Sequence, residues 1–485
     1  MKRVRAYVVI ILLIIVLIKA NAQSYHAFNG SAYAGGLGNF TNPASAINSV
    51  FKWDISVLGF QTNTSNNAVS ITNLTAANLT PDNISKIIVQ PTSGYGVRSF
   101  TNVSDLHLLN IRYNIDDRQS ISFGIRLRSN SFMETSPFSY IDTISGFSGF
   151  VHYNNIKGGA TPFHFHGYNE AWMENDFSYA RVLSEDDEHR FSGGITIALL
   201  RGLSGLYGGI DNLNYTAGAN KNTITSAEAT LLYPANYDKV DSKYTALQNF
   251  KNLRKASKLK LGTSIGFEYV VKEQFFEEKY NPKNYSWKFG VSIMDIGANK
   301  FDTDTSSVIV NTPDAGLTDT SLQNQLQIDR NKNNLKNVLS DSNNFTVDSR
   351  IQNTYKMSLP TRLVFSIDKK IADNIFVNAL FSINFYSNNV SDIYNIKTTE
   401  LNRLIITPRW ETAAWGVYVP IQYTPKHDMM LGLAIKAGPL VVGLHNINWL
   451  QRSKLEELDG GGYLALHFQP FSIIRQHHSL DCFTN

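Results

Sequence analysis

The chain of 485 residues has a single cysteine, Cys482, close to its C-terminus. One cysteine cannot form an internal disulfide, which excludes a disulfide-stapled extracellular module. Charged residues are also scarce, at 17% against an average of about 25% in soluble domains. Hydrogen-bonded elements and packing must therefore hold this chain together.

Long apolar runs are missing after residue 18. Before that point, three basic residues precede an unbroken apolar run at residues 6–18, and Ala20-Asn21-Ala22 follows. This order predicts a secretory signal peptide over residues 1–22. An N-terminal membrane anchor is the alternative, although the run is short for a span of about 20 residues. Removal of residues 1–22 lowers the formal charge from +4 to zero, so no nucleic-acid partner is expected.

The sequence is rich instead in short stretches that alternate at period two. Trp415, Val417 and Val419 fall on one side of such a stretch, whereas Gly416 and Tyr418 fall on the other. Similar stretches recur between residues 53 and 471, and aromatic residues make up 12% of the chain. Apolar residues opposite small or polar ones are typical of strands whose two faces meet different surroundings. We therefore predict an all-β fold, a transmembrane antiparallel β-barrel of about 14 strands over residues 53–471.

The segments around the predicted barrel are rich in small and polar residues. We expect long loops at residues 129–169 and 302–353, a partly helical, polar and basic stretch at 226–258, and a C-terminal tail at 472–485. Residues 23–52 precede the first strand and contain Asn42-Pro43-Ala44, in which Asn42 is predicted to cap a short helix. These residues either form an exposed leader or plug the lumen.

Four charged residues are candidate lumen residues. Arg126 and Arg128 lie opposite the apolar side of a predicted strand, and Arg409 and Glu411 lie two apart on one face of another. In a barrel with an apolar exterior, these side chains point inward. They either bind a polar ligand group or form structural ion pairs that line a wet interior.

Motifs for catalysis and cofactor binding are absent. Residues 202–206 lack the final glycine of a nucleophile elbow, and residues 35–38 lack the spacing of a phosphate loop. His164 and His166 share a face if extended, but no Asp, Glu or Cys at suitable spacing completes a metal site. The sequence therefore predicts no enzyme activity, no cofactor and no metal.

Several segments resemble known families. Asn42-Pro43-Ala44 after a glycine-rich start resembles the entry to barrels of the long-chain fatty-acid transporter (FadL-like) superfamily. Five further pieces, in this order, resemble an uncharacterised family of Gram-negative outer-membrane barrels, a domain of unknown function: residues 193–202, 289–297, 357–361, 407–411 and 432–440. The resemblance implies a barrel of about 14 strands with its N-terminal segment in the lumen. Relatives include fatty-acid and aromatic-hydrocarbon channels and barrel subunits of type IX secretion.

Two functions follow from this resemblance. The first is passive passage of a small apolar or amphipathic solute across the outer membrane, which predicts a continuous apolar pocket beside Asn42-Pro43-Ala44. The alternative is a non-transporting structural or interaction subunit of an outer-membrane secretion or assembly complex. The expected partners are outer-membrane lipid, a hydrophobic small molecule and a protein of such a complex.

Overall fold

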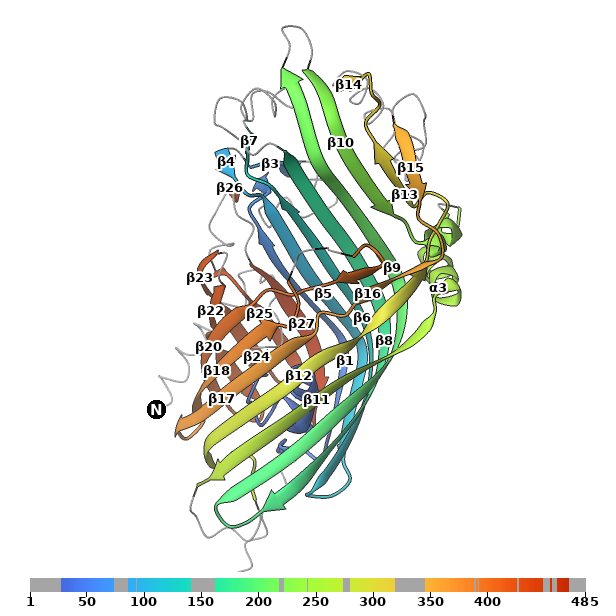
Figure 1. Ribbon diagram of the computed structural model, residues 1–485. Coiled ribbons are helices and arrows are strands. Elements are labelled where there is room, and N and C mark those ends of the chain that lie inside the picture. Colours follow the sequence, from blue (N-terminus) through green and yellow to red (C-terminus); the bar gives the residue numbers. More distant parts are fainter. Residues whose placement is uncertain are drawn as a thin grey trace, which may run out of the picture.

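A computed structural model describes most of the residues of the chain (Figure 1). The predicted signal peptide and the tail at 472–485 lie outside the described residues. None of the helices that the structure describes is long and apolar enough to span a membrane. The described residues are 28–73, 86–92, 94–140, 162–217, 222–241, 243–273, 280–318, 345–387, 390, 392–424, 427–447, 454–455 and 460–470.

The main body is a closed antiparallel barrel of 14 strands, which confirms the predicted fold class. The wall closes where the first strand pairs with the last, from Ile55 opposite Phe468 to Thr64 opposite Gly460. Two of its strands are each interrupted once, at 419–420 and at 432. In order the wall consists of β1 (Trp53–Asn66), β5 (Ser99–Asn114), β6 (Gln119–Thr135), β8 (Phe163–Glu185), β9 (His189–Ala217), β11 (Leu259–Lys272), β12 (Tyr285–Asp302), β17 (Arg362–Ala372), β18 (Ile375–Asn384), β20 (Arg403–Glu411), β21 with β22 (Trp415–Tyr418, Ile421–Thr424), β23 with β24 (His427–Leu431, Leu433–Ala437), β25 (Leu440–Leu444) and β27 (Gly460–Phe468).

The two ends of the barrel differ in their connections. Short turns at residues 115–118, 186–188 and 373–374 join strands at one end, whereas connections such as 67–98 and 303–361 join them at the other. Outer-membrane barrels place short turns in the periplasm and long loops outside the cell. We therefore call the two ends the periplasmic and the outer end.

The outer face of the wall is apolar. On β11, for example, Leu261, Ile265 and Phe267 are exposed, whereas Gly262, Ser264 and Gly266 of the alternate row are buried. Aromatic side chains gather near the periplasmic end, as in the interfacial girdles of membrane barrels. These exposed aromatic residues are Trp53, Tyr113, Tyr269, Trp287, Trp410, Trp415 and Phe468. A closed barrel with such an apolar belt fits the hydrocarbon of a bilayer better than it fits water.

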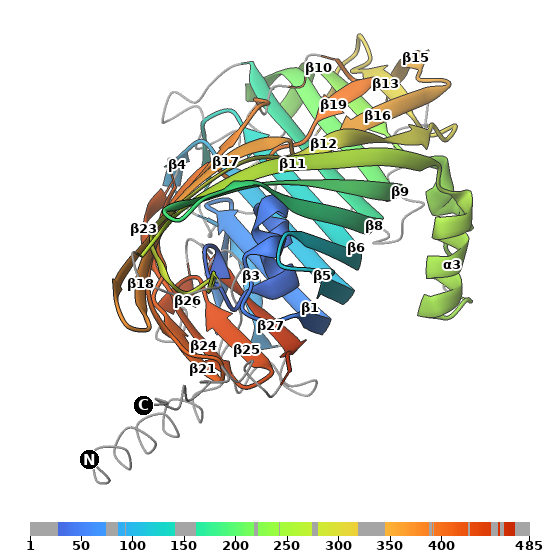
Figure 2. The same cartoon turned by 90° about the horizontal axis from the view of Figure 1, so that it is seen from below.

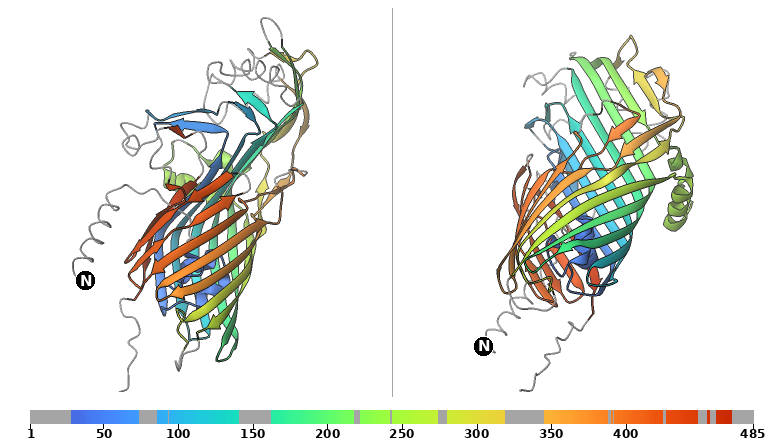
Figure 3. Two further views of the ribbon diagram at one scale, coloured as in Figure 1. Left: turned by 90° about the vertical axis from the view of Figure 1, so that its left-hand side faces the viewer. Right: turned by 60° about the horizontal axis from the view of Figure 1, so that its bottom comes forward.

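One side of the wall extends far beyond this belt at the outer end (Figure 3). Only residues 189–201 of β9 pair with β11, and its later residues pair with β10 (Asn222–Leu232). The extension also contains β13 (Val308–Asn311), β14 (Leu317–Thr318), β15 (Thr346–Arg350), β16 (Thr354–Ser358) and β19 (Asn395–Lys397). Between β10 and β11 the chain forms η6 (Ala235–Lys239) and α3 (Ala246–Ala256), so the predicted helix is present in the second half of residues 226–258. Small additional strands are β2 (Val69–Thr72), β3 (Ile88–Pro91), β4 (Gly94–Gly96), β7 (Phe138–Tyr140) and β26 (Lys454–Leu455).

The extension corrects the two predicted loops. Residues 129–135 continue β6 and pair with residues 165–171 of β8, so both lie in strands and not in a loop over 129–169. Residues 308–311 and 346–350, which fall in the predicted loop at 302–353, pair with each other. The physical reason is that both faces of a strand beyond the membrane meet water or protein. The alternation of apolar and polar side chains then weakens, although the strands continue to pair through their backbones.

Residues 28–51, here called the inner segment, lie inside the ring of strands (Figure 2). They form two short 3₁₀ helices, η2 (Gly35–Phe40) and η3 (Pro43–Ile47). The Asn42 side chain accepts a hydrogen bond from the backbone N–H of Ala44 at 3.0 Å, which confirms the predicted cap. Nearly every residue of the segment is buried, and its apolar side chains pack with inward residues of β21, β24, β25 and β27.

Candidate functional site

Asn42-Pro43-Ala44 packs against inward-facing glycines of the wall. A Cβ atom at Gly194 would lie 2.5 Å from the backbone nitrogen of Ala44, and one at Gly266 would overlap the Asn42 side chain. The Asn42 amide also donates to the carbonyl of Phe267 at 2.9 Å. Glycine inside a strand often marks a close approach of another backbone. These positions therefore bring the inner segment into direct contact with β9 and β11.

A buried ion pair anchors both halves of the inner segment to β1 and β5. Arg112 Nε lies 2.5 Å from Asp54 Oδ2, and neither side chain is exposed. Asp54 accepts a hydrogen bond from the backbone N–H of Gly36 at 2.8 Å. Arg112 donates to the carbonyls of Ala46 at 3.2 Å and Phe51 at 2.6 Å. One cation and one anion thus satisfy backbone groups that would otherwise be buried without partners.

The second anchor holds the start of the inner segment on the opposite side. Arg409 pairs with Asp368 at 2.5 Å and with Glu411 at 3.0 Å, and all three side chains are buried. Arg409 also donates to the carbonyl of Gly30 at 3.3 Å, and the Ser31 hydroxyl donates to Glu411 at 2.6 Å. The structure therefore places the candidate residues Arg409 and Glu411 together, facing inward. Both side chains bind other groups of the protein, as expected of a structural ion pair.

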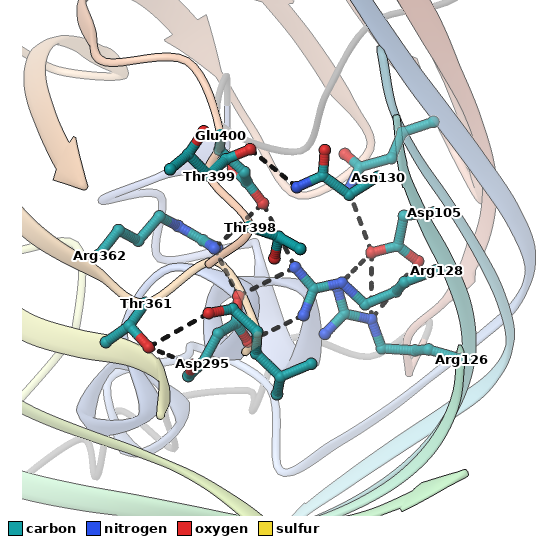
Figure 4. Close-up of polar contacts among 12 residues, drawn as sticks. Asp105, Arg126, Arg128, Asn130, Asp295, Thr361, Arg362, Thr398, Thr399 and Glu400 are labelled. Carbon is teal, nitrogen blue, oxygen red and sulfur yellow. Dashed lines mark hydrogen bonds and ion pairs between the residues drawn. The ribbon is translucent and has the colours of Figure 1, made fainter. Parts of the chain in front are cut away.

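The candidates Arg126 and Arg128 belong to a larger group of ion pairs toward the outer end (Figure 4). We call it the charged cluster, and its members are Arg126, Arg128, Arg362, Arg403, Asp105, Glu174, Asp295 and Glu400. Arg128 binds both oxygens of Asp295, at 2.8 and 2.9 Å, and Arg362 contacts the same carboxylate. Arg126 pairs with Asp105 and, at 2.7 Å, with Glu174. The cluster links β5, β6, β8, β12, β17 and the start of β20 across the lumen.

Asp295 reaches this cluster because β12 contains a bulge. Strict alternation after Phe289, Val291 and Ile293 would direct residue 295 toward lipid. Instead, Asp295 has a φ of +58°, and both it and Met294 are buried while Ile296 is exposed. A bulge adds one residue and reverses the phase of a strand. The irregular backbone therefore moves a carboxylate from the lipid face to the centre of the charged cluster.

Two small cavities lie beside the inner segment. Each has a volume of about 30 Å³, and Phe40 and Arg126 line both. The Arg126 guanidinium lies 4.0 Å from the centre of the Phe40 ring, so this cation–π pair forms part of the wall between them. The first cavity is lined by apolar side chains such as Met294 and by charged ones such as Asp295, and the second by four arginines of the charged cluster. The two are small, separate spaces with charged residues in their linings, in contrast to the expected continuous apolar pocket.

Sequence reasoning missed most members of the two anchors and the charged cluster. Asp54, Arg112 and Asp368 each occupy the polar side of a strand whose other side is apolar, and that pattern marks them as inward. Their pairing depends on which strands are neighbours, so one strand alone does not reveal it. The inward glycines, including Gly194 and Gly266, carried a clearer signal, because a wall facing an empty lumen has no need of them.

The closed barrel, its apolar belt and its filled polar interior define the class of the protein. It is a transmembrane β-barrel of the outer-membrane type.

Within this class, the chain belongs to a family of unknown function (DUF5723), whose model matches residues 43–444. No curated protein matches the chain. Among solved structures, the TodX deltaS2S3 mutant monoaromatic hydrocarbon channel is 8% identical, with a TM-score of 0.42, and the match covers 90% of this chain and 94% of that one. A FadL homologue of Pseudomonas aeruginosa is 11% identical, with a TM-score of 0.39, over 93% and 98% of the two chains. Similarity at this level does not indicate a shared substrate.

Proposed function

We propose that the protein is a gated outer-membrane channel, closed in the conformation described here, in which the inner segment acts as the plug. The observation that carries this proposal is the arrangement of the two cavities. They lie along the lumen beside the inner segment, and the Phe40–Arg126 pair lies between them. Displacement of Phe40 would join the cavities, whereas the wall strands would keep their pairing.

The lining of the cavities suggests the chemistry of the solute. Apolar side chains such as Met294 and Leu359 face the same space as Arg126 and Asp295. A purely apolar solute would have to pass charged groups that it cannot hydrogen-bond, at a cost in desolvation. An amphipathic solute with a small polar head would match both kinds of lining. We therefore place small amphipathic molecules before hydrocarbons as the cargo.

The test is passage across reconstituted membranes. We expect the wild-type barrel in planar bilayers to stay closed for most of the recording, and Phe40→Ala to increase the frequency of open events several-fold. Leu37→Ala is the matched control, because Leu37 is also a buried residue of the inner segment but lines neither cavity. Liposomes loaded with the same variants then report uptake of a short-chain fatty acid against a sugar of similar size.

A negative result has a specific meaning. A variant lacking residues 28–51 that folds but remains closed would contradict the gating proposal. Folding is checked by the shift in gel mobility that folded barrels show before heating. If this deletion fails to fold, the Phe40→Ala recordings test the gating proposal, because this substitution removes one ring and leaves the anchors intact. No increase in open events would then contradict the proposal.

A second candidate function, an interaction subunit of a secretion or assembly complex, draws on the outer extension. β9 runs for 29 residues, and β10, β13 and β15 add to the sheet beyond the belt. A wall that only conducts a solute does not need this added surface. Gentle detergent extraction followed by mass spectrometry tests it, and a stoichiometric protein partner together with a barrel that never opens would favour this function.

A further inference from the structure

The helix α3 lies outside the barrel wall (Figures 1 and 2). Thr245 and Gln248 form a capping box at its start. At its end, Arg201 of β9 donates to the carbonyls of Arg254 at 3.4 Å and Ser257 at 3.2 Å. An arginine of the wall therefore binds the last carbonyls of the helix and fixes its height on the barrel.

That height is the outer edge of the apolar belt. Immediately after the helix, Leu259 and Leu261 begin the outward row of β11, with 53% and 66% of their surface exposed. On the neighbouring β9, the exposed Ile195 and Ile197 come before Arg201 on the same face. The outward rows thus change from apolar to basic at the level of α3. This is the place where hydrocarbon gives way to lipid head groups on the outer side.

The free face of α3 is basic. Lys251, Arg254 and Lys255 are exposed, and the helix contains no acidic residue. The exposed Leu247 lies one turn before Lys251, so an apolar side chain accompanies the cations. Asp302, at the end of β12, is already paired with Lys258 at 2.5 Å. Arg254 and Lys255 lie in the last turn, where they also suit the helix dipole, but that effect does not reach Lys251.

We propose that Lys251, Arg254 and Lys255 bind the phosphate groups of anionic lipid in the outer leaflet, with Leu247 resting among the acyl chains. Cationic helices that lie at an interface bind in this way, with the apolar side in lipid and the charges at the head groups. The proposal depends on the barrel lying in the outer membrane, but it does not depend on the barrel opening. The helix would then tie the outer extension to the surrounding lipid.

The test uses the full chain in phosphatidylcholine nanodiscs, with bisphosphorylated lipid A as the probe. Native mass spectrometry and titration with fluorescent lipid A measure binding to the wild type and to K251Q/R254Q/K255Q. Each basic residue near an anionic surface contributes about 1 kcal/mol, or about fivefold in affinity. We therefore expect a loss on the order of 100-fold at low salt, which shrinks as salt increases.

Matched variants test whether lipid A binding depends on the cations of α3 or on the total positive charge of the protein. K52Q/R118Q/K369Q removes three exposed cations at the periplasmic end and should leave lipid A binding unchanged. K251R/R254K/K255R retains the charge and should bind like the wild type. Competition by inorganic phosphate at millimolar concentration, without preference for lipid A, would identify the site as one for free phosphate and overturn the lipid proposal.

Two further outcomes would also overturn it. Equal binding of dephosphorylated lipid A would mean that the acyl chains alone account for the contact. Unchanged lipid A binding by K251Q/R254Q/K255Q, together with loss of a co-purifying protein from native extracts, would assign the surface to that protein. Channel recordings are not part of this test, so a barrel that never opens leaves its result unaffected.

Discussion

Replacement of Arg409 by Met tests whether the second anchor stabilises the barrel. Among the described residues, Arg409 is the only cation in an ion pair with Asp368 and Glu411, and both carboxylates are almost fully buried. Removal of one partner of a buried ion pair typically costs about 3–5 kcal/mol, because it leaves an uncompensated charge. Each carboxylate keeps two hydrogen bonds to other side chains, which favours the lower end of this range. We expect a loss of about 3 kcal/mol.

The assay is equilibrium unfolding in urea of the barrel reconstituted in lipid vesicles, followed by tryptophan fluorescence. The comparison is R409M/D368N/E411Q, which removes the cation together with both anions. Neutral groups of similar shape at a buried site are often tolerated, so this variant should recover most of the loss. If R409M is as stable as the wild type, or if the triple variant is no more stable than R409M, the reasoning is wrong.

Two smaller changes test the contacts of the inner segment with the wall. Gly194→Ala places a methyl group 2.5 Å from the backbone nitrogen of Ala44 and should displace residues 43–44, seen as faster exchange of the Ala44 amide, which is hydrogen-bonded to Asn42. Gly124→Ala is the control, because its nearest neighbour would lie at 3.6 Å. Asn48→Ala removes a 2.5 Å hydrogen bond to the buried Glu268 and should cost about 1–3 kcal/mol by the same urea assay. Unchanged exchange in the first case, or unchanged stability in the second, would contradict the described contacts.

The wall of the barrel could be predicted from the sequence because lipid imposes one rule on every strand. A residue that faces the bilayer must be apolar, so residues such as Phe289, Val291 and Ile293 reveal their strand without any knowledge of its neighbours. The same rule gave the inward direction of Arg126 and Arg409. It failed beyond the belt, where β6 and β8 continue through residues expected to form a loop. Beyond the membrane neither face of a strand meets lipid, so the sequence shows no apolar row. Such a strand is recognised only by its pairing with its neighbours.

The contents of the lumen could not be predicted in the same way, because they depend on contacts between distant strands. Asp295 shows this most clearly. By strict alternation it would occupy an outward position of β12. Its own φ of +58° reverses the alternation, so its carboxylate reaches Arg128 and Arg362. Its surroundings also explain why a bulge is tolerated there, since several hydrogen bonds and ion pairs offset the local backbone cost. Reading an interior of this kind requires the neighbour order of the strands, and that order becomes visible only in the folded barrel.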